Sequence, residues 1–261
     1  MDNIGCIICV NYNSWNDTLS FFESIEEKNR FDFFVIDNSP ELNTKQKNNM
    51  PKKINYYVGD NKLGYYNNVY RLRKKIELSK YLFVIVSNVD VEFISKKNVK
   101  KILNTLKQYD IIAPSIINLD LKQQNPFRKN KISRFDKYFW SIAYSNFFLF
   151  KILFFSRSLI SNFLKIKNFK INETQIKIWA PHGAFVIFSN DSFKKIFSEK
   201  FNFWLYGEED YIGNLSYKLN LKVMFNPKIK ILHKEGISSS SFSSLRKYKL
   251  YKQAYYSNYD Q

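Results

Sequence analysis

Short apolar runs alternate with amphipathic stretches along residues 4–114. The runs are rich in β-branched and aromatic residues, as is typical of strands that are buried on both faces of a sheet. The amphipathic stretches repeat apolar residues at the spacing of one helix face, for example at Val99, Ile102 and Leu106. This alternation predicts an α/β fold, a mostly parallel central sheet with helices on both faces. The predicted strands are IGCIICV (4–10), FFVID (33–37), INYYV (54–58), YLFVIVS (81–87) and DIIAP (110–114).

A second patterned block begins after a segment of different character. Residues 126–172 are basic and aromatic and contain no strand pattern. The final residues, 241–261, are rich first in Ser and then in Lys and Tyr, which predicts either a loosely held tail or a docked helix. The block between them predicts strands at 184–189, 222–225 and 229–233, and helices at 191–197 and 212–219.

The composition is that of a folded domain with a strongly basic balance. Of 261 residues, 45% are hydrophobic and 18% aromatic, which excludes a disordered chain. Lys and Arg number 41 against 23 Asp and Glu, for a formal charge of +18. Such a charge favours an anionic partner: nucleic acid, a phosphorylated metabolite or an anionic membrane surface. An AT-rich genome would also enrich Lys, so the charge alone does not identify a function.

The cysteines and the hydropathy both indicate a cytoplasmic protein. Cys6 and Cys9 lie in the apolar run 4–10, which favours buried thiols in a reducing compartment over an exposed redox or metal site. The sequence enters a strand pattern at once, without a signal peptide. Its longest apolar region, 138–160, is interrupted by basic residues and falls short of a membrane span.

Polar and small residues follow four of the predicted strands. The carboxyl ends of parallel strands meet at one edge of an open α/β sheet, where such folds bind their ligands. Each residue alone would be ordinary for a loop, and their convergence is what predicts a site. Neither a dinucleotide fingerprint nor a P-loop motif occurs, so a bound diphosphate would need another source of positive charge. The residues are Asn11, Asn13, Asp37, Asn38, Asn61, Lys62, Gly64, Ser87, Asn88 and Asp90.

Asp90 is a candidate ligand for a cation that would supply this charge. The stretch SNVD leaves its carboxylate at a strand tip, where it can hold Mg²⁺ or Mn²⁺ whose other ligands are phosphate oxygens and water. A solvated turn residue is the alternative. His233 ends another predicted strand and is either a second metal ligand or structural, and His182 is either structural or part of the site.

The densest acidic cluster of this basic chain lies in FNFWLYGEEDYIG. Glu208, Glu209 and Asp210 follow an aromatic run and begin a predicted helix, whose macrodipole and free N–H groups stabilise negative charge. One interpretation is a general base that accepts a proton from an attacking hydroxyl group, and the other is only a favourable helix start. Under the first interpretation Trp204 and Tyr206 are surfaces on which a sugar ring stacks. Under the second they are aromatic residues of the core.

Taken in order, these motifs resemble family 2 glycosyltransferases of the GT-A fold, in particular bacterial enzymes of capsule or O-antigen assembly. The likeness is carried by VNYNSWNDTLSFFESI, VIDNSP, VGDNKLGYYNNVYRL and FVIVSNVDVEF, then by HGAFVIFSNDSFKKI and FNFWLYGEEDYIGNLSYKLNLKVMFNPKIKILHKEG. It covers roughly residues 4–120 and 179–240 and does not include 126–172 or the tail. The specificity lies in the set and its order, since no single motif is distinctive.

The resemblance implies an inverting hexosyl transfer from a nucleotide-sugar donor, UDP- or dTDP-linked, to a hydroxyl of a glycan or a lipid-linked glycan. A divalent cation, Mn²⁺ or Mg²⁺, would be held by Asp90 and His233. The first acid of the family's D-x-D motif is Asn88 here, which contributes no charge and would lie nearer the ribose or phosphate. The implied contacts of the donor nucleotide are Asn11, Asn13, Asp37, Asn38, Asn61, Lys62, Gly64 and Asn88.

The acidic cluster falls on the family's E-D motif, which supplies the catalytic base. The resemblance favours Glu209 as that base, with Asp210 second and Glu208 third. Consecutive residues point roughly 100° apart around a helix, so only one of the three can face the donor squarely. The implied contacts of the acceptor or the transferred sugar are Trp204, Tyr206 and His182.

The organisation expected from the resemblance is a single catalytic domain, 1–240, followed by a tail at 241–261. Its nucleotide-sugar half would be 1–120 and its acceptor half 176–240, with a helical insertion at 126–172. Aromatic and basic residues interleave in that insertion, which predicts contact with an anionic membrane surface or with the acceptor. Internal packing and a homodimer contact are the alternatives. The enzyme would then lie peripherally on the inner face of the plasma membrane.

Two other functions compete with this interpretation. A sugar nucleotidyltransferase would need a Gly-rich basic loop after the first strand, and VNYNSWND contains neither Gly nor Lys or Arg. A non-enzymatic nucleic-acid-binding protein would fit the charge and the interleaved aromatics. Carboxylates at the strand ends would repel a phosphate backbone unless they were loaded with metal, so nucleic acid is not an expected partner.

Overall fold

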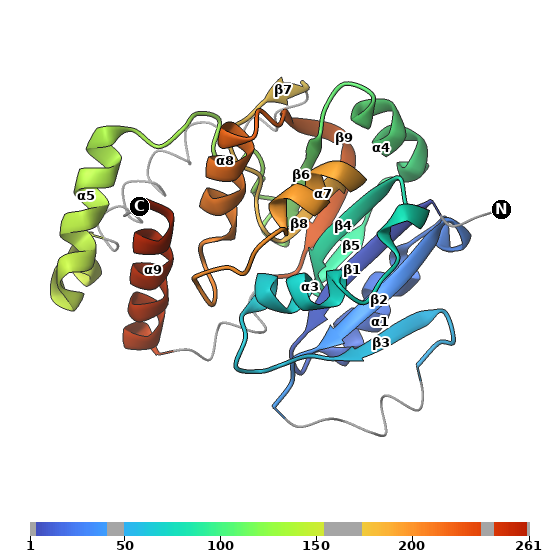
Figure 1. The fold of residues 1–261 in the computed structure, drawn as a ribbon, viewed down its shortest axis with the longest axis horizontal. Coiled ribbons are helices and arrows are strands. Elements are labelled where there is room, and N and C mark those ends of the chain that lie inside the picture. Colours follow the sequence, from blue (N-terminus) through green and yellow to red (C-terminus); the bar gives the residue numbers. More distant parts are fainter. Residues whose placement is uncertain (1–3, 41–49, 154–173, 236–242, 260–261) are drawn as a thin grey trace.

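A single sheet forms the centre of the molecule (Figure 1), in a computed structural model that describes residues 4–40, 50–153, 174–235 and 243–259. The described strands pair in the order β3-β2-β1-β4-β8-β6-β9-β5, and β7 pairs with β9. They are β1 (Gly5–Asn11), β2 (Phe31–Asp37), β3 (Ile54–Val58), β4 (Phe83–Asn88), β5 (Val91–Phe93), β6 (Ile111–Asn118), β7 (Ile176–Lys177), β8 (Phe185–Ser189) and β9 (Val223–His233).

The sheet is mixed, and most of its strands run in one direction. Strands β3, β2, β1 and β4 are mutually parallel, and β8 is antiparallel to both β4 and β6. Strand β6 therefore runs in the direction of β4 and β1, and β9, which is parallel to β6, shares that direction. Only β5, β7 and β8 oppose it among the described strands.

Helices cover both faces of the sheet (Figure 1). Helices α1 and α4 contribute to one buried cluster, and α3, α7 and α8 contribute to the other. Successive residues of β1 alternate between the two clusters, with Cys6 and Ile8 in one and Ile7 and Cys9 in the other. The predicted α/β architecture is therefore confirmed. The helices are α1 (Trp15–Ser24), α3 (Tyr65–Arg73), α4 (Asn98–Leu106), α5 (Arg134–Ser145), α7 (Asn190–Ile196), α8 (Glu208–Lys218) and α9 (Ser244–Tyr259), with 3₁₀ turns at Lys28–Arg30 and Leu78–Lys80.

Strand β9 joins two of the predicted strands into one of 11 residues. Its pairing with β6 shifts register between Pro114 and Ser115, which lie opposite Asn226 and Lys230. Pro227 falls in this interval and has no N–H to donate to the ladder, so the irregularity accommodates it. The strand then continues to His233, the residue that the sequence predicts at a strand end.

The C-terminal residues form a helix that docks on the rest of the protein. Helix α9 lies beside α5 (Figure 1), and Tyr144, Phe150 and Tyr248 form a small buried cluster there. Residues 134–153 of the predicted insertion are helical except at position 146, and the positions 154–172 lie outside the described residues. Among the helices described, none has both the length and the apolar character required to cross a bilayer.

Candidate functional site

A cavity of about 620 Å³ opens at the carboxyl ends of β1 and β4. Three predicted residues, Asn88, Asp90 and His233, line what we call its strand side. What we call its loop side consists of Trp204, Tyr206, Glu208 and Glu209. Asn38 and His182 also line the cavity. The other residues predicted for the site lie outside the lining: Asn11, Asn13, Asp37, Asn61, Lys62, Gly64, Ser87 and Asp210.

Strand pairing brings the two predicted metal ligands together. Strands β5 and β9 are antiparallel with Val91 opposite His233, so His233 lies beside Asp90. The distance between His233 Nε2 and Asp90 Oδ1 is 3.4 Å. Both residues are 7% exposed and at the same time line the cavity.

The partners of His233 determine which ring nitrogen carries the proton. Its Nδ1 lies 2.8 Å from Gln124 Oε1, and the amide nitrogen of Gln124 donates to Glu235 Oε1. Because the amide oxygen of Gln124 can only accept, Nδ1 must be the protonated nitrogen. In the neutral ring the lone pair of Nε2 is directed toward Asp90, as is usual for a metal-binding histidine whose other nitrogen is held by a hydrogen bond.

This pair fits a divalent cation. A carboxylate oxygen and a neutral imidazole nitrogen are both ligands that Mn²⁺ accepts. Within the part of the chain that the structure describes, no group of three or more His, Cys, Asp or Glu is arranged around a possible metal position. Asp90 and His233 would therefore hold the cation with few protein ligands, which leaves positions for phosphate oxygens and water.

Glu208 and Glu209 differ in how they are held. Burial, and then the charge of Glu209, raise the pKa of Glu208 to about 8, and its Oε1 has no hydrogen-bond partner among the described residues. Burial also raises the pKa of Glu209, but the Gly183 N–H donates to its Oε1 at 3.1 Å and opposes the shift. Burial thus favours the protonated form of both carboxyl groups, and the larger effect is on Glu208.

Asp210, the third member of the acidic cluster, is directed elsewhere. Its Oδ1 accepts from Arg128 Nε at 2.9 Å, and its side chain is 22% exposed. Burial raises the pKa of Asp210, and the positive charge of Arg128 counteracts that effect. The structure thus separates this acid from the two neighbours that line the cavity.

His182 lines the cavity in the opposite tautomer to His233. Its Nδ1 accepts from the Ala184 N–H at 3.1 Å, which leaves the proton of the neutral ring on Nε2. Burial, and then the neighbouring His233, lower the pKa of His182 to about 4. His182 is thus a neutral hydrogen-bond donor at the cavity.

Asn11 and Asp37 form a buried pair beneath the strand ends. Asn11 Nδ2 donates to Asp37 Oδ1 at 3.0 Å, and the two residues are 0% and 1% exposed. Asp37 also accepts from the hydroxyls of Ser39 and Tyr56. Ser39 in turn accepts from the Asn13 N–H at 2.9 Å. These side chains stabilise the loops that follow β1 and β2, and they use most of their hydrogen-bonding capacity there.

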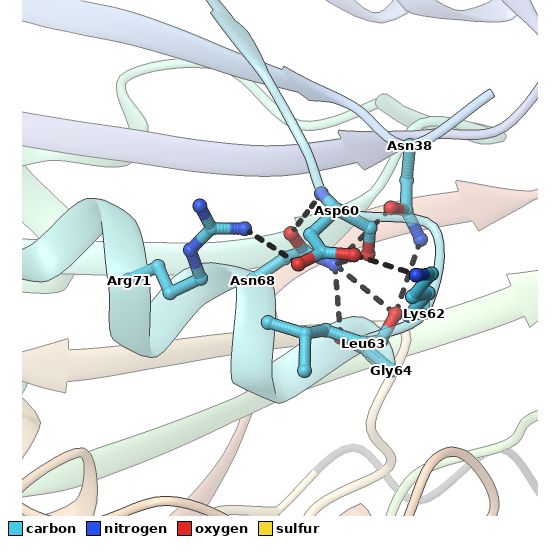
Figure 2. A network of polar contacts seen from close by, with 7 residues as sticks. All are labelled: Asn38, Asp60, Lys62, Leu63, Gly64, Asn68 and Arg71. Carbon is cyan, nitrogen blue, oxygen red and sulfur yellow. Dashed lines mark hydrogen bonds and ion pairs between the residues drawn. The ribbon is translucent and has the colours of Figure 1, made fainter. Parts of the chain in front are cut away.

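Asn68 of α3 organises the segment that precedes its helix (Figure 2). Its Oδ1 accepts from the Asp60 N–H at 2.9 Å, and Arg71 forms an ion pair with Asp60 at 3.3 Å. Asn61 and Lys62 lie on the turn that is held in this way, and both are exposed. The acceptors 3.1–3.2 Å from Asn68 Nδ2 are Asn38 Oδ1 and the carbonyl oxygens of Asp60, Leu63 and Gly64.

The same helix holds the loop side of the cavity. Asn67 donates to the Phe201 carbonyl and accepts from its N–H, each at 2.9 Å. A Cβ atom on Gly64 would lie 1.8 Å from the Trp204 carbonyl oxygen, so only glycine permits this approach of the two backbones. Gly64 therefore contributes by its small size and does not itself line the cavity.

Comparisons with known proteins agree on the fold. No protein-family model matches the sequence, and no curated protein matches it. The chain is similar in structure to GalNAc-T7 crystallised with UDP, GalNAc and Mn²⁺, with a TM-score of 0.61 and 12% identity over 90% of this chain and 44% of that one. It is also similar to residues 1–349 of S. aureus TarS, with a TM-score of 0.51 and 13% identity over 88% and 60% of the two chains. This chain has the GT-A fold. It spans about half the length of these two structures.

Several residues that line the GT-A cavity carry no signal in the sequence. Gln124 orients His233, and Tyr251 enters the cavity from α9. Tyr65 also lines the cavity, and its buried hydroxyl has no partner among the described residues. Only its place in the quoted motif VGDNKLGYYNNVYRL could have drawn attention to Tyr65. The other two lie outside every motif.

Proposed function

We propose that this chain is an inverting glycosyltransferase of bacterial surface-polysaccharide synthesis. It transfers a hexosyl group from a UDP- or dTDP-sugar to a hydroxyl of a glycan or lipid-linked glycan. The observation that carries the proposal is that the Asp90–His233 pair and the buried Glu208 and Glu209 line one cavity. Such a transfer needs a base for the incoming hydroxyl and positive charge for the departing diphosphate. UDP, GalNAc and Mn²⁺, the molecules crystallised with GalNAc-T7, are of the classes that this cavity would hold.

Glu209 is the base in this proposal. The acceptor hydroxyl gives its proton to Glu209 while its oxygen bonds to the anomeric carbon, and the bond from that carbon to the diphosphate oxygen breaks. Glu209 is supported for this role because it lines the cavity and the Gly183 N–H favours its ionised form. Glu208, whose buried Oε1 has no hydrogen-bond partner among the described residues, stays protonated beside it. Asp210 is a weaker candidate because Arg128 holds its carboxylate.

The donor lies along the strand side in this proposal. A Mn²⁺ or Mg²⁺ ion supplies the positive charge that the leaving diphosphate requires. Asp90 and His233 hold that ion, and Gln124 keeps His233 in the tautomer that can bind it. Asn38 and Asn88 line the cavity and would contact the nucleotide, and the buried Asn11–Asp37 pair would shape the loops around it.

A lipid-linked acceptor would bring the enzyme to the inner face of the membrane. Helix α5 exposes Phe135, Tyr138 and Ile142 at helical spacing, with 76%, 66% and 40% of each residue accessible. Lys and Arg outnumber acids around this stripe, as suits an anionic lipid surface. Flotation with phosphatidylglycerol vesicles tests the contact. Absence of binding at low salt would reject it, and light scattering would then show whether the stripe forms a homodimer instead.

The activity is tested by incubating the protein with a panel of UDP- and dTDP-sugars and Mn²⁺. We expect hydrolysis or transfer from at least one donor, and loss of that turnover in excess chelator. Fluorescence titration with UDP and Mn²⁺, in parallel with a single-stranded oligonucleotide, separates this function from nucleic-acid binding. Tight binding of the oligonucleotide with no response to UDP would overturn the proposal.

A further inference from the structure

Tyr251 of α9 lines the cavity next to its loop side. Its ring stacks on that of Tyr206, with centroids 4.3 Å apart and planes 12° apart. Tyr206 precedes the two cavity carboxylates, Glu208 and Glu209, by only two and three positions. A residue from the C-terminal helix is therefore in direct contact with the segment that leads into the acidic cluster.

The backbone of Tyr206 needs such a contact. Its φ angle is 72°, in the left-handed region that residues with a Cβ atom seldom adopt. A residue in this region persists only when its surroundings hold it there. The stacked ring of Tyr251 provides this restraint, and Tyr251 is itself packed beside the buried cluster of α5 and α9.

Helix α9 holds the residues on both sides of Tyr206 as well. Asn258 Nδ2 donates to the Gly207 carbonyl at 3.1 Å, and a Cβ atom on Gly207 would lie 2.9 Å from that of Ala254. Ser257 Oγ donates to the Asn202 carbonyl at 2.9 Å. The loop from 202 to 207 is thus attached to α9 at its beginning, at Tyr206 and at its end.

We propose that Tyr251 is a positioning residue for the transfer reaction. By stacking on Tyr206 it holds the left-handed turn from which Glu208 and Glu209 enter the cavity. Tyr251 acts through Tyr206 and not on the reacting atoms. This role rests on the proposed glycosyltransferase function, although the contact that it describes can be tested without it.

The first test is Tyr251→Ala, assayed with the nucleotide sugar that the wild type hydrolyses. We expect kcat to fall about 10- to 100-fold, because a small displacement of a catalytic carboxylate has an effect of that size. The dissociation constant for UDP in the presence of Mn²⁺, measured by calorimetry, should change less than about threefold. Tyr251→Phe keeps the ring and should recover most of the turnover. Lys249→Ala, on the exposed side of α9, is the matched control and should behave like the wild type.

A second substitution distinguishes positioning from a direct contact with the sugar. Glycine adopts a φ of 72° without support, so adding Tyr206→Gly to Tyr251→Ala should regain turnover by about threefold or more. If the stacked rings are instead a platform for the sugar, the double variant will be no better than Tyr251→Ala. That result would overturn the proposal.

Hydrogen exchange provides a readout that does not depend on activity. In Tyr251→Ala, faster exchange should be confined to the amides from 204 to 211, with the strands protected as in the wild type. Unchanged exchange there, or wild-type kcat, would overturn the positioning role. Loss of protection throughout the protein would also overturn it, because Tyr251 would then be needed for folding in general. If the wild type hydrolyses no donor, the proposed function fails, and the exchange experiment still decides whether Tyr251 holds the loop.

Discussion

The two sides of the cavity are held in place by different means. On the strand side, Asp90 and His233 are placed by main-chain pairing, because β5 and β9 align Val91 with His233. On the loop side, the residues from 201 to 209 belong to no strand, and contacts from two helices restrain them. Helix α3 supplies Asn67, and α9 supplies Tyr251.

This difference indicates which side is vulnerable to which change. A sheet tolerates the loss of one side chain because the hydrogen bonds of its ladders remain. A loop restrained by a few side-chain contacts loses its position when one of them is removed. Substitutions on the strand side should therefore affect ligand binding and leave the fold intact, whereas substitutions around the loop side should move the carboxylates.

The largest effect is expected from Asp90→Ala. Turnover should fall by about 10³-fold or more, because in the proposed mechanism the cation that neutralises the leaving diphosphate would lose its carboxylate ligand. The thermal unfolding temperature should stay close to that of the wild type, and excess chelator should inactivate the wild type to a similar extent. Glu23→Ala, an exposed acid on α1 that lies outside the cavity, is the control. Full turnover of the wild type in excess chelator would contradict the role of the metal.

The next effect concerns the base on the loop side. Glu209→Gln should lower kcat by about 10²–10⁴-fold with little change in UDP binding, since it removes the proton acceptor and keeps the shape. Asp210→Asn should cost far less, because Arg128 already holds that carboxylate. If Asp210→Asn lowers turnover more than Glu209→Gln does, the base is Asp210. If the amide variants of all three acids keep full turnover, the cluster only favours the start of the helix and has no catalytic role.

Glu208 gives the loop side a pH-dependent stability. Its pKa is about 8 in the folded protein against an ordinary value of 4.5, so the folded state binds the proton more tightly than the unfolded state. The contribution of Glu208 to the free energy of unfolding therefore decreases as pH rises between these values. Glu208→Gln should be more stable than the wild type above pH ~8, by about 1–4 kcal/mol, and the difference should vanish toward pH ~5. Thermal unfolding across this range measures it, and a constant difference would show that Glu208 does not titrate as described.

The smallest effect in this series is expected for Gly64→Ala. The added methyl group would meet the Trp204 carbonyl oxygen, so α3 and the loop would have to separate. We expect a loss of about 1–3 kcal/mol in the free energy of unfolding, as for other overpacked sites, together with lower turnover. Asn61→Ala, on the exposed turn of the same segment, should leave both quantities near wild type. Equal stability of the two variants would mean that the close approach is not required.

The N-terminal part of the sheet could be predicted closely. The apolar runs at 4–10, 33–37 and 54–58 correspond to β1, β2 and β3 within two residues at each end. Burial on both faces leaves such a strong local pattern that the neighbours are not needed to recognise it. Strand β5 and helix α3 were not predicted, because three residues are too few to show a period and the polar surface of α3 obscures its buried stripe.

Candidate site residues could be predicted from the sequence, but which of them face the cavity could not. The polar strand ends, the acidic cluster with the aromatic run before it, and the two histidines pointed to nine residues that do line the cavity. Asn11 and Asp37 belonged to the same pattern, yet they bond to each other below it. A strand-end position predicts proximity to the site. Whether a side chain faces the cavity or a neighbour depends on partners such as Tyr56, which lies elsewhere in the sequence.

The sequence by itself determined most of the elements, the edge of the sheet where a site would form, and the residue types available there. Periodicity and turn chemistry act over a few neighbouring residues, so they can be recognised without knowledge of the rest of the chain. Three contacts were decided by the tertiary structure alone. His233 lies beside Asp90, Arg128 binds the carboxylate of Asp210 away from the cavity, and Tyr251 stacks on Tyr206. Each of these contacts joins segments far apart in the chain. They depend on strand register and helix docking, which the folded core as a whole determines.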